Sequence, residues 1–179
     1  MNEQKRSRTL KLDIGCGRNK RPGFVGLDCV AGEGVDIVHD LTVFPWPVES
    51  NTVEAMVMFD VLEHLPDTVG TFNELHRIAL PGCRVEITYP YWRSFGCYSD
   101  PTHVRFFNEY MIEYFLSSDS STRNERKFSY YTDKHWKLIS RRLITYPFLK
   151  WMPDRFLSFV SRHFCDVVHA VHLVISPEK

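Results

Sequence analysis

A short apolar run that ends in an acid and two closely spaced glycines constrains the fold of this chain most. The stretch LKLDIGCGRNKRPGFVGLD covers residues 10–28, and a second apolar run within it ends in another acid, Asp28. Gly15 and Gly17 allow unusual φ angles and let a ligand approach the backbone closely. Ligands of open parallel sheets bind at the carboxyl ends of the strands, so the stretch predicts a ligand-binding loop between two such strands.

The rest of the chain alternates strand-like and helix-like segments. Residues 53–62 form a nearly continuous apolar run, which is typical of a strand covered on both faces. Residues 66–80 repeat apolar side chains at helical spacing, and 84–92 have the pattern of the next strand. This order predicts a βαβ unit, and therefore a parallel sheet with a right-handed crossover. Further strands are expected over 9–15, 24–28, 34–41, 137–147 and 169–176, and further helices over 108–118 and 153–168.

Length and composition fit one domain. The chain has 179 residues, 44% of them hydrophobic, and its 22 basic and 22 acidic side chains cancel. A neutral chain argues against a protein that generally coats nucleic acid. We expect a single domain over 1–179, in which 1–8 are flexible and 93–168 supply an acceptor loop, helices and a lid.

The location of the protein is inferred from its cysteines and from its apolar runs. Five cysteines without a C-x-x-C pair argue against a disulfide framework and indicate a reducing, cytoplasmic location. The polar start of the chain does not resemble a signal peptide. Because no run approaches 18 apolar residues, we expect no membrane-spanning helix.

The acid at the end of the second strand indicates an adenosine-type ligand. The carboxylate of Asp28 can accept hydrogen bonds from both hydroxyls of a ribose. A dinucleotide-binding loop would carry a third glycine at the start of a helix, but Lys20 holds that position. Asp13, just ahead of the glycines, would attract an ammonium group and repel phosphates. The loop therefore favours a ligand with a cationic amine over a nicotinamide dinucleotide.

In their order along the chain, the motifs resemble those of the class I S-adenosylmethionine-dependent methyltransferases, and most of all the methyltransferase type 11 branch. The motifs are LDIGCG with GLD, HDL, FDVLEHLPD and ELHRIALPGCRVEITYP, within residues 9–92. The resemblance implies a Rossmann-like, doubly wound α/β fold, with a seven-stranded, mostly parallel sheet whose last strand runs antiparallel. Only ten residues separate Gly17 from Asp28, so the first helix of the family must be shortened or absent.

The resemblance also implies the cofactor and its contacts. S-adenosyl-L-methionine would be the methyl donor and S-adenosyl-L-homocysteine the product. The glycine loop would line the methionine part, and Asp28 would hold the ribose. Arg18 or Lys20 would meet the cofactor carboxylate, unless both are simply solvated. The full set expected at the cofactor is Asp13, Gly15, Cys16, Gly17, Arg18, Lys20, Asp28, Cys29, Asp40, Leu41, Met58, Phe59 and Asp60.

The acceptor site is expected beyond the methyl group, from segments that follow the fourth and fifth strands. Residues 89–107 are rich in aromatic side chains and carry His103, whose ordinary pKa suits a general base. His64 and Tyr91 are the further catalytic candidates. A structural role stays open for both histidines, His103 in an ordered turn and His64 at a helix start. Because no H-E-x-x-H motif is present, we expect no metal site.

Two features of the C-terminal half concern partners. The basic segment 123–142 could meet an anionic substrate or RNA, or it could be a solvated face. The helical stripe of Phe156, Val160, Phe164 and Val168 would pack on the sheet or cover the acceptor site. A homodimer or a membrane contact through this stripe is the alternative.

The predicted function is methyl transfer from S-adenosylmethionine to a small-molecule acceptor. Whether an oxygen, a nitrogen or a carbon atom accepts the methyl group is left open. The alternatives are an RNA or protein methyltransferase and a non-catalytic S-adenosylmethionine-binding protein. A nicotinamide-dependent oxidoreductase is disfavoured by the missing third glycine.

Overall fold

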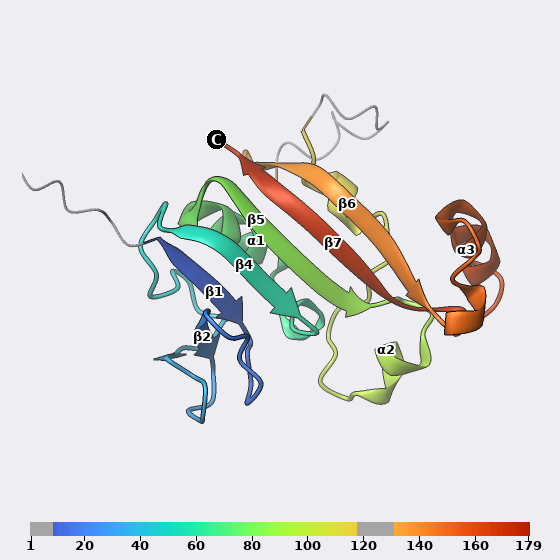
Figure 1. Ribbon diagram of the computed structural model, residues 1–179, viewed down its shortest axis with the longest axis horizontal. Helices are drawn as coiled ribbons and strands as arrows, with labels where there is room; N and C mark the ends of the chain where they lie inside the picture. The colour runs from blue at the N-terminus through green and yellow to red at the C-terminus, as the bar shows by residue number, and fades with distance from the viewer. Residues whose placement is uncertain (1–8, 118–130) are drawn as a thin grey trace, which may run out of the picture.

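One mixed sheet forms the centre of the protein. The structure, a computed structural model, describes residues 9–117 and 131–179 (Figure 1). Within these residues seven strands lie in the order β3-β2-β1-β4-β5-β7-β6. Strands β1 to β5 pair in parallel, whereas β7 runs antiparallel to both of its neighbours. The predicted mostly parallel sheet with an antiparallel last strand is confirmed. The flexibility expected of 1–8 concerns residues outside the described ranges.

The strands and helices have the following bounds. The strands are β1 Leu10–Ile14, β2 Val25–Asp28, β3 Ile37–Val38, β4 Val53–Phe59, β5 Ala79–Pro90, β6 His135–Thr145 and β7 Val168–Glu178. The α-helices are α1 Thr68–Ile78, α2 Phe95–Ser99 and α3 Asp154–Ser161. The short 3-10 helices are η1 Leu62–His64, η2 Met111–Tyr114 and η3 Pro147–Leu149.

Helix α1 covers one face of the sheet and confirms the predicted βαβ unit. It begins where the Asp67 carboxylate accepts a hydrogen bond from the Gly70 amide at 2.8 Å. Its buried residues Phe72, Leu75 and Ile78 recur at helical spacing and join the core of the sheet. In Figure 1 the helix lies behind β4 and β5.

The opposite face of the sheet carries no helix among the described residues (Figure 1). The connections between β1 and β4 are loops, so the shortened first helix is in fact absent. On β5, Arg84 and Glu86 are exposed or half-buried and alternate with the buried Val85 and Ile87. A period of two is the pattern of a strand with one solvated face. β4 departs likewise from the expected double coverage, because Glu54 is exposed.

The segment after β5 contains less helix than predicted. Instead of a helix over 108–118, only the turn of 3-10 helix from Met111 to Tyr114 forms. The Asn108 side chain accepts a hydrogen bond from the Tyr110 amide at 2.9 Å, as a cap does. That bond closes a two-residue turn, and the chain does not continue into an α-helix.

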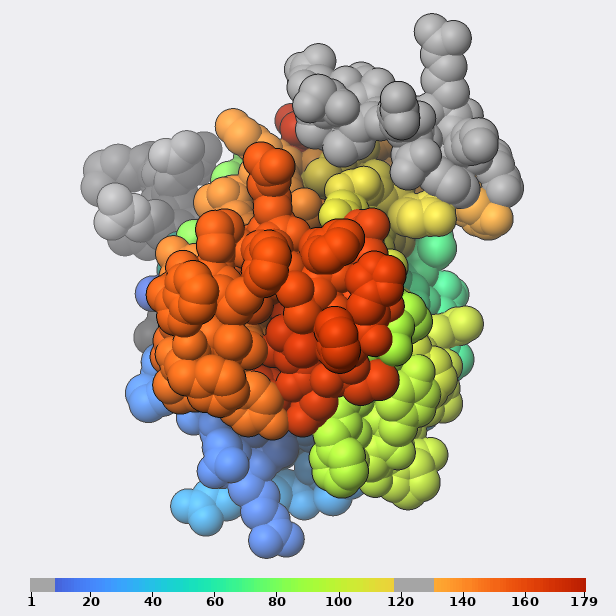
Figure 2. Space-filling view, turned by 90° about the vertical axis from the view of Figure 1, so that its right-hand side faces the viewer, coloured from blue at the N-terminus to red at the C-terminus, as the bar shows by residue number. Residues whose placement is uncertain are grey.

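Helix α3 is shorter than the predicted helix over 153–168 and turns another face to the core. Of the predicted stripe, Phe156 and Phe164 are 49% and 64% exposed, whereas Val168 is buried as the first residue of β7. Leu157 and Ser161 are buried instead, and the Ser161 hydroxyl donates to the Tyr91 oxygen at 3.0 Å. Figure 2 looks onto the end of the molecule where α3 lies. The spacing is helical, but the buried face is that of Leu157, Ser158 and Ser161, and its hydroxyls find hydrogen-bond partners in the core.

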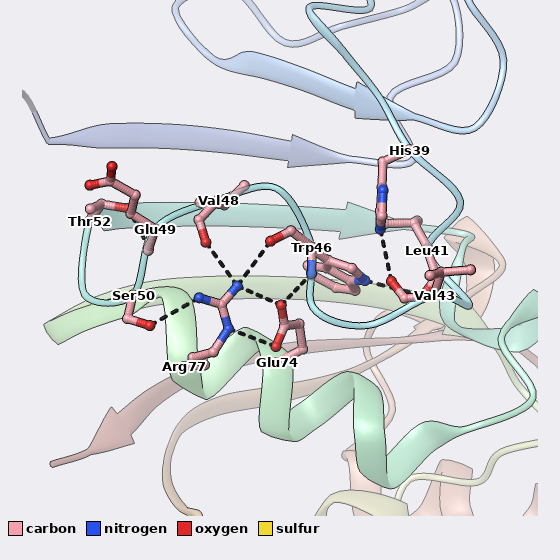
Figure 3. Close-up of polar contacts among 10 residues, drawn as sticks. All are labelled: His39, Leu41, Val43, Trp46, Val48, Glu49, Ser50, Thr52, Glu74 and Arg77. Carbon is pink, nitrogen blue, oxygen red and sulfur yellow. Dashed lines mark hydrogen bonds and ion pairs between the residues drawn. The ribbon is translucent and has the colours of Figure 1, made fainter.

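A loop replaces the usual helix between β3 and β4, and α1 holds it (Figure 3). The Arg77 guanidinium donates to the carbonyls of Trp46 and Val48 at 3.1 and 2.8 Å and pairs with Glu74 at 2.6 Å. The Glu74 carboxylate also accepts from the Trp46 amide at 2.6 Å. The indole of Trp46 donates to the Leu41 carbonyl at 3.1 Å. This network fixes the loop that follows β3.

None of the helices in the described ranges combines the length and the apolar character that crossing a membrane requires.

Candidate functional site

A cavity of about 350 Å³ lies at the carboxyl ends of β1, β2 and β4. Parallel strands end at the same edge of a sheet, so the topology brings together residues that lie up to 50 positions apart. Its volume falls in the usual range for small-ligand sites. The lining residues are Gly15, Asp28, Cys29, Asp40, Leu41, Thr42, Asp60, Val61, His64 and Leu65.

The glycine loop closes onto Asp28. Gly15 and Gly17 have φ angles of 68° and 53°, in the left-handed region that favours glycine. The Asp28 carboxylate accepts hydrogen bonds from the amides of Gly17 at 2.8 Å and Val30 at 3.1 Å. A Cβ atom on Gly15 would come within 2.3 Å of Val61. Glycine is therefore needed for the loop to pack this closely, and the packing holds Asp28 at the cavity wall.

Two further loop residues expected at the cofactor bind to the protein itself. The buried Asp13 carboxylate accepts a hydrogen bond from the Arg21 amide at 2.7 Å. The Lys20 ammonium group lies 2.7 Å from the Asp36 carboxylate. This contact holds the pKa of Asp36 below its usual value. Arg18 is exposed, and of the two basic candidates for a cofactor carboxylate it is the one not engaged by Asp36.

The end of β4 presents its residues to different surroundings. Met58 is fully buried in the core. Phe59 lies on the open face of the sheet, where the Arg21 guanidinium is 5.1 Å from its ring centroid. Asp60 turns with a φ angle of 53° into the cavity wall, and partial burial raises the pKa of its carboxyl. Cys16 is buried under the glycine loop.

The structure thus gathers part of the expected cofactor set at one cavity. Gly15, Asp28, Cys29, Asp40, Leu41 and Asp60 line it. Asp13, Cys16, Gly17, Arg18, Lys20, Met58 and Phe59 lie around it without lining it. Thr42, Val61 and Leu65 line the cavity and were missed, because neutral wall residues carry no chemical signal. The one available signal was their position, because each directly follows a residue expected at the site: Leu41, Asp60 or His64.

A polar cluster stands where η1 meets the segment 100–105. The amides of Val104 and Arg105 donate to the Glu63 carbonyl at 2.9 and 3.0 Å and tie the two segments together. The Glu63 side chain is only 2% exposed, and neither of its carboxylate oxygens has a hydrogen-bond partner. Burial raises the pKa of Glu63 to about 7, and the nearby charge of Asp60 acts in the same direction.

Both candidate histidines belong to this cluster. The rings of His64 and His103 stand edge to face with 4.8 Å between centroids. His103 Nδ1 lies 2.8 Å from the Cys97 carbonyl, and its Nε2 lies 3.9 Å from the Glu63 carboxylate. His64 Nδ1 lies 2.9 Å from the Thr102 hydroxyl. The fold therefore brings together two histidines that are 39 positions apart in the sequence.

The third catalytic candidate and the aromatic segment lie elsewhere. Tyr91 is buried and bonded to Ser161, and burial raises the pKa of its hydroxyl. Residues of the segment 89–107 do not line the 350 Å³ cavity. They line two others, of about 790 Å³ beside Trp92 and about 560 Å³ beside Phe106.

The cavity has the features that an adenosine-type cofactor requires. It lies at the carboxyl ends of parallel strands, beside a glycine loop, with a carboxylate from the end of β2 in its wall. Asp40, which accepts hydrogen bonds from the Thr42 amide and hydroxyl, shapes the opposite rim. The residues present therefore fit S-adenosylmethionine as the ligand.

Comparisons with known proteins rest on structure, because no family model and no curated protein matches the sequence. An S-adenosylmethionine-dependent methyltransferase from Archaeoglobus fulgidus has a TM-score of 0.58 at 14% identity, over 95% of this chain and 86% of that one. Phosphoethanolamine N-methyltransferase 2 from Haemonchus contortus, in complex with S-adenosyl-L-methionine, has a TM-score of 0.57 at 16% identity, and the match covers 96% of this chain and 49% of that one. The cyclase SpnF has a TM-score of 0.57 at 13% identity, and the match covers 94% of this chain and 75% of that one.

Likeness at such low identity shows the arrangement of the chain rather than its reaction. The match covers 94–96% of this chain in each of the three neighbours, so the likeness extends over nearly the whole sheet and its connections. The protein has the fold of the class I S-adenosylmethionine-dependent methyltransferases.

Proposed function

We propose that the protein transfers a methyl group from S-adenosylmethionine to a small-molecule acceptor. The observation that carries the proposal is the cavity at the strand ends, which the Asp28 carboxylate, held by the glycine loop, lines together with Asp40 and Asp60. A carboxylate in this position binds the hydroxyls of a ribose. The fold neighbours, among them proteins solved with S-adenosyl-L-methionine or S-adenosylhomocysteine, support the same ligand.

Each wall of the cavity has a part in the proposed reaction. Asp28 binds the ribose, and the rim at Asp40 and Leu41 contacts the adenine. Asp60 and His64 form the wall on the side of the polar cluster, where the acceptor would enter. Methyl transfer from a sulfonium needs mainly proximity and orientation, and a base only where the acceptor atom is protonated. In this proposal His64, which lines the cavity, would take that proton, and His103 stands beside it.

Two of the four described cations of the basic segment, Lys134 and Arg141, are paired with carboxylates, and this favours a small acceptor over RNA. Of the basic segment 123–142, Lys134 is paired with Asp133 at 2.8 Å, and Arg141 lies 3.3 Å from the Glu113 carboxylate. Residues 123, 126 and 127 of this segment lie outside the described ranges. Cations that are already paired contribute less to phosphate binding.

A second candidate is a protein that binds S-adenosylmethionine but does not transfer its methyl group. The specific observation in its favour is the likeness to SpnF, which is named as a cyclase. One fold thus supports different chemistry. The acceptor side of the cavity would then bind a substrate whose reaction uses no methyl donor.

Calorimetry and a transfer assay test the proposal. We expect S-adenosylhomocysteine to bind at one molecule per chain and NAD not to bind, because the glycine loop lacks the helix start that a pyrophosphate needs. Tritiated methyl groups should pass from S-adenosylmethionine to low-molecular-weight material in a cell extract, and nuclease or protease treatment should not abolish this transfer. Binding of NAD without S-adenosylhomocysteine would refute the cofactor, and binding without transfer would select the second candidate.

A further inference from the structure

We propose that Glu63, His64 and His103 bind a divalent first-row transition-metal ion at the edge of the cavity. One ligand atom of each residue lies within 4.8 Å of those of the other two. Two imidazoles and one carboxylate form a common protein ligand set for zinc and for non-haem iron. A local H-E-x-x-H motif was the pattern sought in the sequence, whereas this set joins residues from two separate segments.

The carboxylate of Glu63 is the strongest indication of a missing partner. It is almost fully buried, and both of its oxygens lack a hydrogen-bond partner. The nearest cationic candidate, His103 Nε2, lies at 3.9 Å, beyond hydrogen-bond distance. The backbone of Glu63 is fixed by the amides of Val104 and Arg105. Buried carboxylates are normally paired or bound to metal, so the unpaired carboxylate of Glu63 is a candidate ligand for a cation.

The hydrogen bonds around the two histidines leave both Nε2 atoms as ligands. A carbonyl only accepts, so His103 Nδ1 donates to Cys97 at 2.8 Å. The Thr102 hydroxyl donates to the Asp100 carboxylate at 2.6 Å, and its oxygen therefore accepts from His64 Nδ1 at 2.9 Å. In both neutral rings Nε2 then keeps its lone pair. Metal-binding histidines are oriented by outer hydrogen bonds of this kind.

The separations require a modest contraction on binding. Ligand atoms around a tetrahedral zinc ion at about 2.0–2.1 Å lie roughly 3.3 Å apart. For the set of ligand atoms that lies within 4.8 Å, the widest separation would therefore shorten by about 1.5 Å. Rotation of the Glu63 side chain can supply much of this, because no hydrogen bond of its carboxylate has to break.

The ion would lie beside the proposed methyl donor, because His64 belongs both to the cluster and to the cavity wall. A bound divalent ion holds an acceptor oxygen and lowers its pKa. This deepens the proposed function, and rests on it, by favouring a hydroxyl acceptor over a carbon or nitrogen acceptor. In that case His64 and His103 act as ligands and not as bases. Binding of the ion itself does not depend on methyl transfer.

Titration of chelator-treated protein with Co²⁺ and Zn²⁺ tests the site. We expect one ion per chain by calorimetry, with Co²⁺ absorption bands of nitrogen and oxygen ligation. Glu63→Gln, which keeps the side-chain volume, and His103→Gln should each weaken binding at least tenfold. His163→Gln, at an exposed histidine outside the cluster, should bind as the wild type does. Circular dichroism of each variant checks its fold, and Glu63→Gln decides the matter if His103→Gln does not fold.

Several results would overturn the inference. The inference fails if folded Glu63→Gln binds the ion as tightly as the wild type does. It also fails if His163→Gln loses as much affinity for the ion as the two cluster variants do. Thiolate charge-transfer bands in the Co²⁺ spectrum would place the ion at an exposed cysteine, Cys29 or Cys165. The two proposals can fail independently. If the protein binds S-adenosylhomocysteine but not Co²⁺, only the metal site is refuted. If it binds Co²⁺ but not S-adenosylhomocysteine, only the proposed cofactor is refuted.

Discussion

Asp28 connects the glycine loop with the cavity through a single carboxylate. Its two oxygens accept the amide hydrogens of Gly17 and Val30, so the side chain is fixed before any ligand arrives. A fixed carboxylate loses little conformational entropy when it binds a ribose, and this favours affinity.

Replacing Asp28 with alanine should weaken S-adenosylhomocysteine binding at least tenfold. Hydrogen bonds to a charged group contribute roughly 1.5–3 kcal/mol each, and about 1.4 kcal/mol already corresponds to tenfold. Isothermal calorimetry measures the change. Asp28→Asn keeps an acceptor for the Gly17 amide and separates loop collapse from the loss of charge. An unaltered dissociation constant in a folded Asp28→Ala variant would exclude Asp28 as the ribose ligand.

The loop between β3 and β4 shows how an element without regular structure can hold a binding site. Its contacts with α1 centre on Arg77, which joins two loop carbonyls and the buried Glu74 (Figure 3). The same loop carries Leu41, which lines the cavity. The helix of the βαβ unit therefore supports the rim that the proposed adenine would contact.

Arg77→Met should lower the free energy of unfolding by about 2–3 kcal/mol. Removing the partner of a buried charge costs roughly 3–5 kcal/mol, and the 30% exposure of the Arg77 side chain reduces that figure. Arg84→Met is the matched control, since Arg84 also pairs with a glutamate, Glu86, but is 52% exposed. It should change stability by less than about 1 kcal/mol. Urea unfolding measures both, and equal losses would show that the loop network adds nothing.

At the scale of the whole molecule, α1 is joined to the last strand, β7, by a hydrogen bond between distant parts of the chain. His76 Nε2 donates to the Glu178 carbonyl at 3.0 Å across 102 positions of sequence, and its ring stands edge-on to Trp136. Burial lowers the pKa of His76 below its ordinary value of 6.5. Folding therefore favours the neutral imidazole of His76 more than the unfolded chain does.

The stability of the wild type should therefore fall relative to His76→Gln as the pH drops below about 6.5. In that range the unfolded chain binds a proton at His76 that the folded protein resists, so protonation favours unfolding. Glutamine keeps a donor for the Glu178 carbonyl and does not titrate. The measurement is the unfolding free energy of both proteins between pH 8 and pH 5, with His163→Gln as the exposed control. If the unfolding free energies of the wild type and His76→Gln differ by the same amount throughout this pH range, the lowered pKa of His76 is refuted.

The exposed face of the sheet corresponds to an alternation of polar and apolar residues in β5. Alternation in RVEITY, residues 84–89, marks a strand with one solvated face, yet the family resemblance implied helices on both faces. Likewise, Phe156 and Phe164 belong to one predicted helical stripe, yet α3 ends at Ser161, Phe156 is exposed on it, and Leu157 and Ser161 are the buried residues. Periodicity identifies a face, but the partner across the core decides which face is buried.

The glycine loop, the acid at the end of β2 and the βαβ unit of β4, α1 and β5 could be predicted from the amino-acid pattern, because each is built from segments that follow one another directly in the chain. Glycine at 15 and 17 and the apolar spacing of α1 are local signals of backbone geometry and burial. Folding of distant segments brings Glu63 and His64 to His103 and puts Tyr91 in the core, and neither could be predicted from the pattern. The reason is physical: the contact follows from how the segment after β5 folds back onto η1, and the backbone bonds from Val104 and Arg105 to Glu63 that fix it leave no pattern in the sequence.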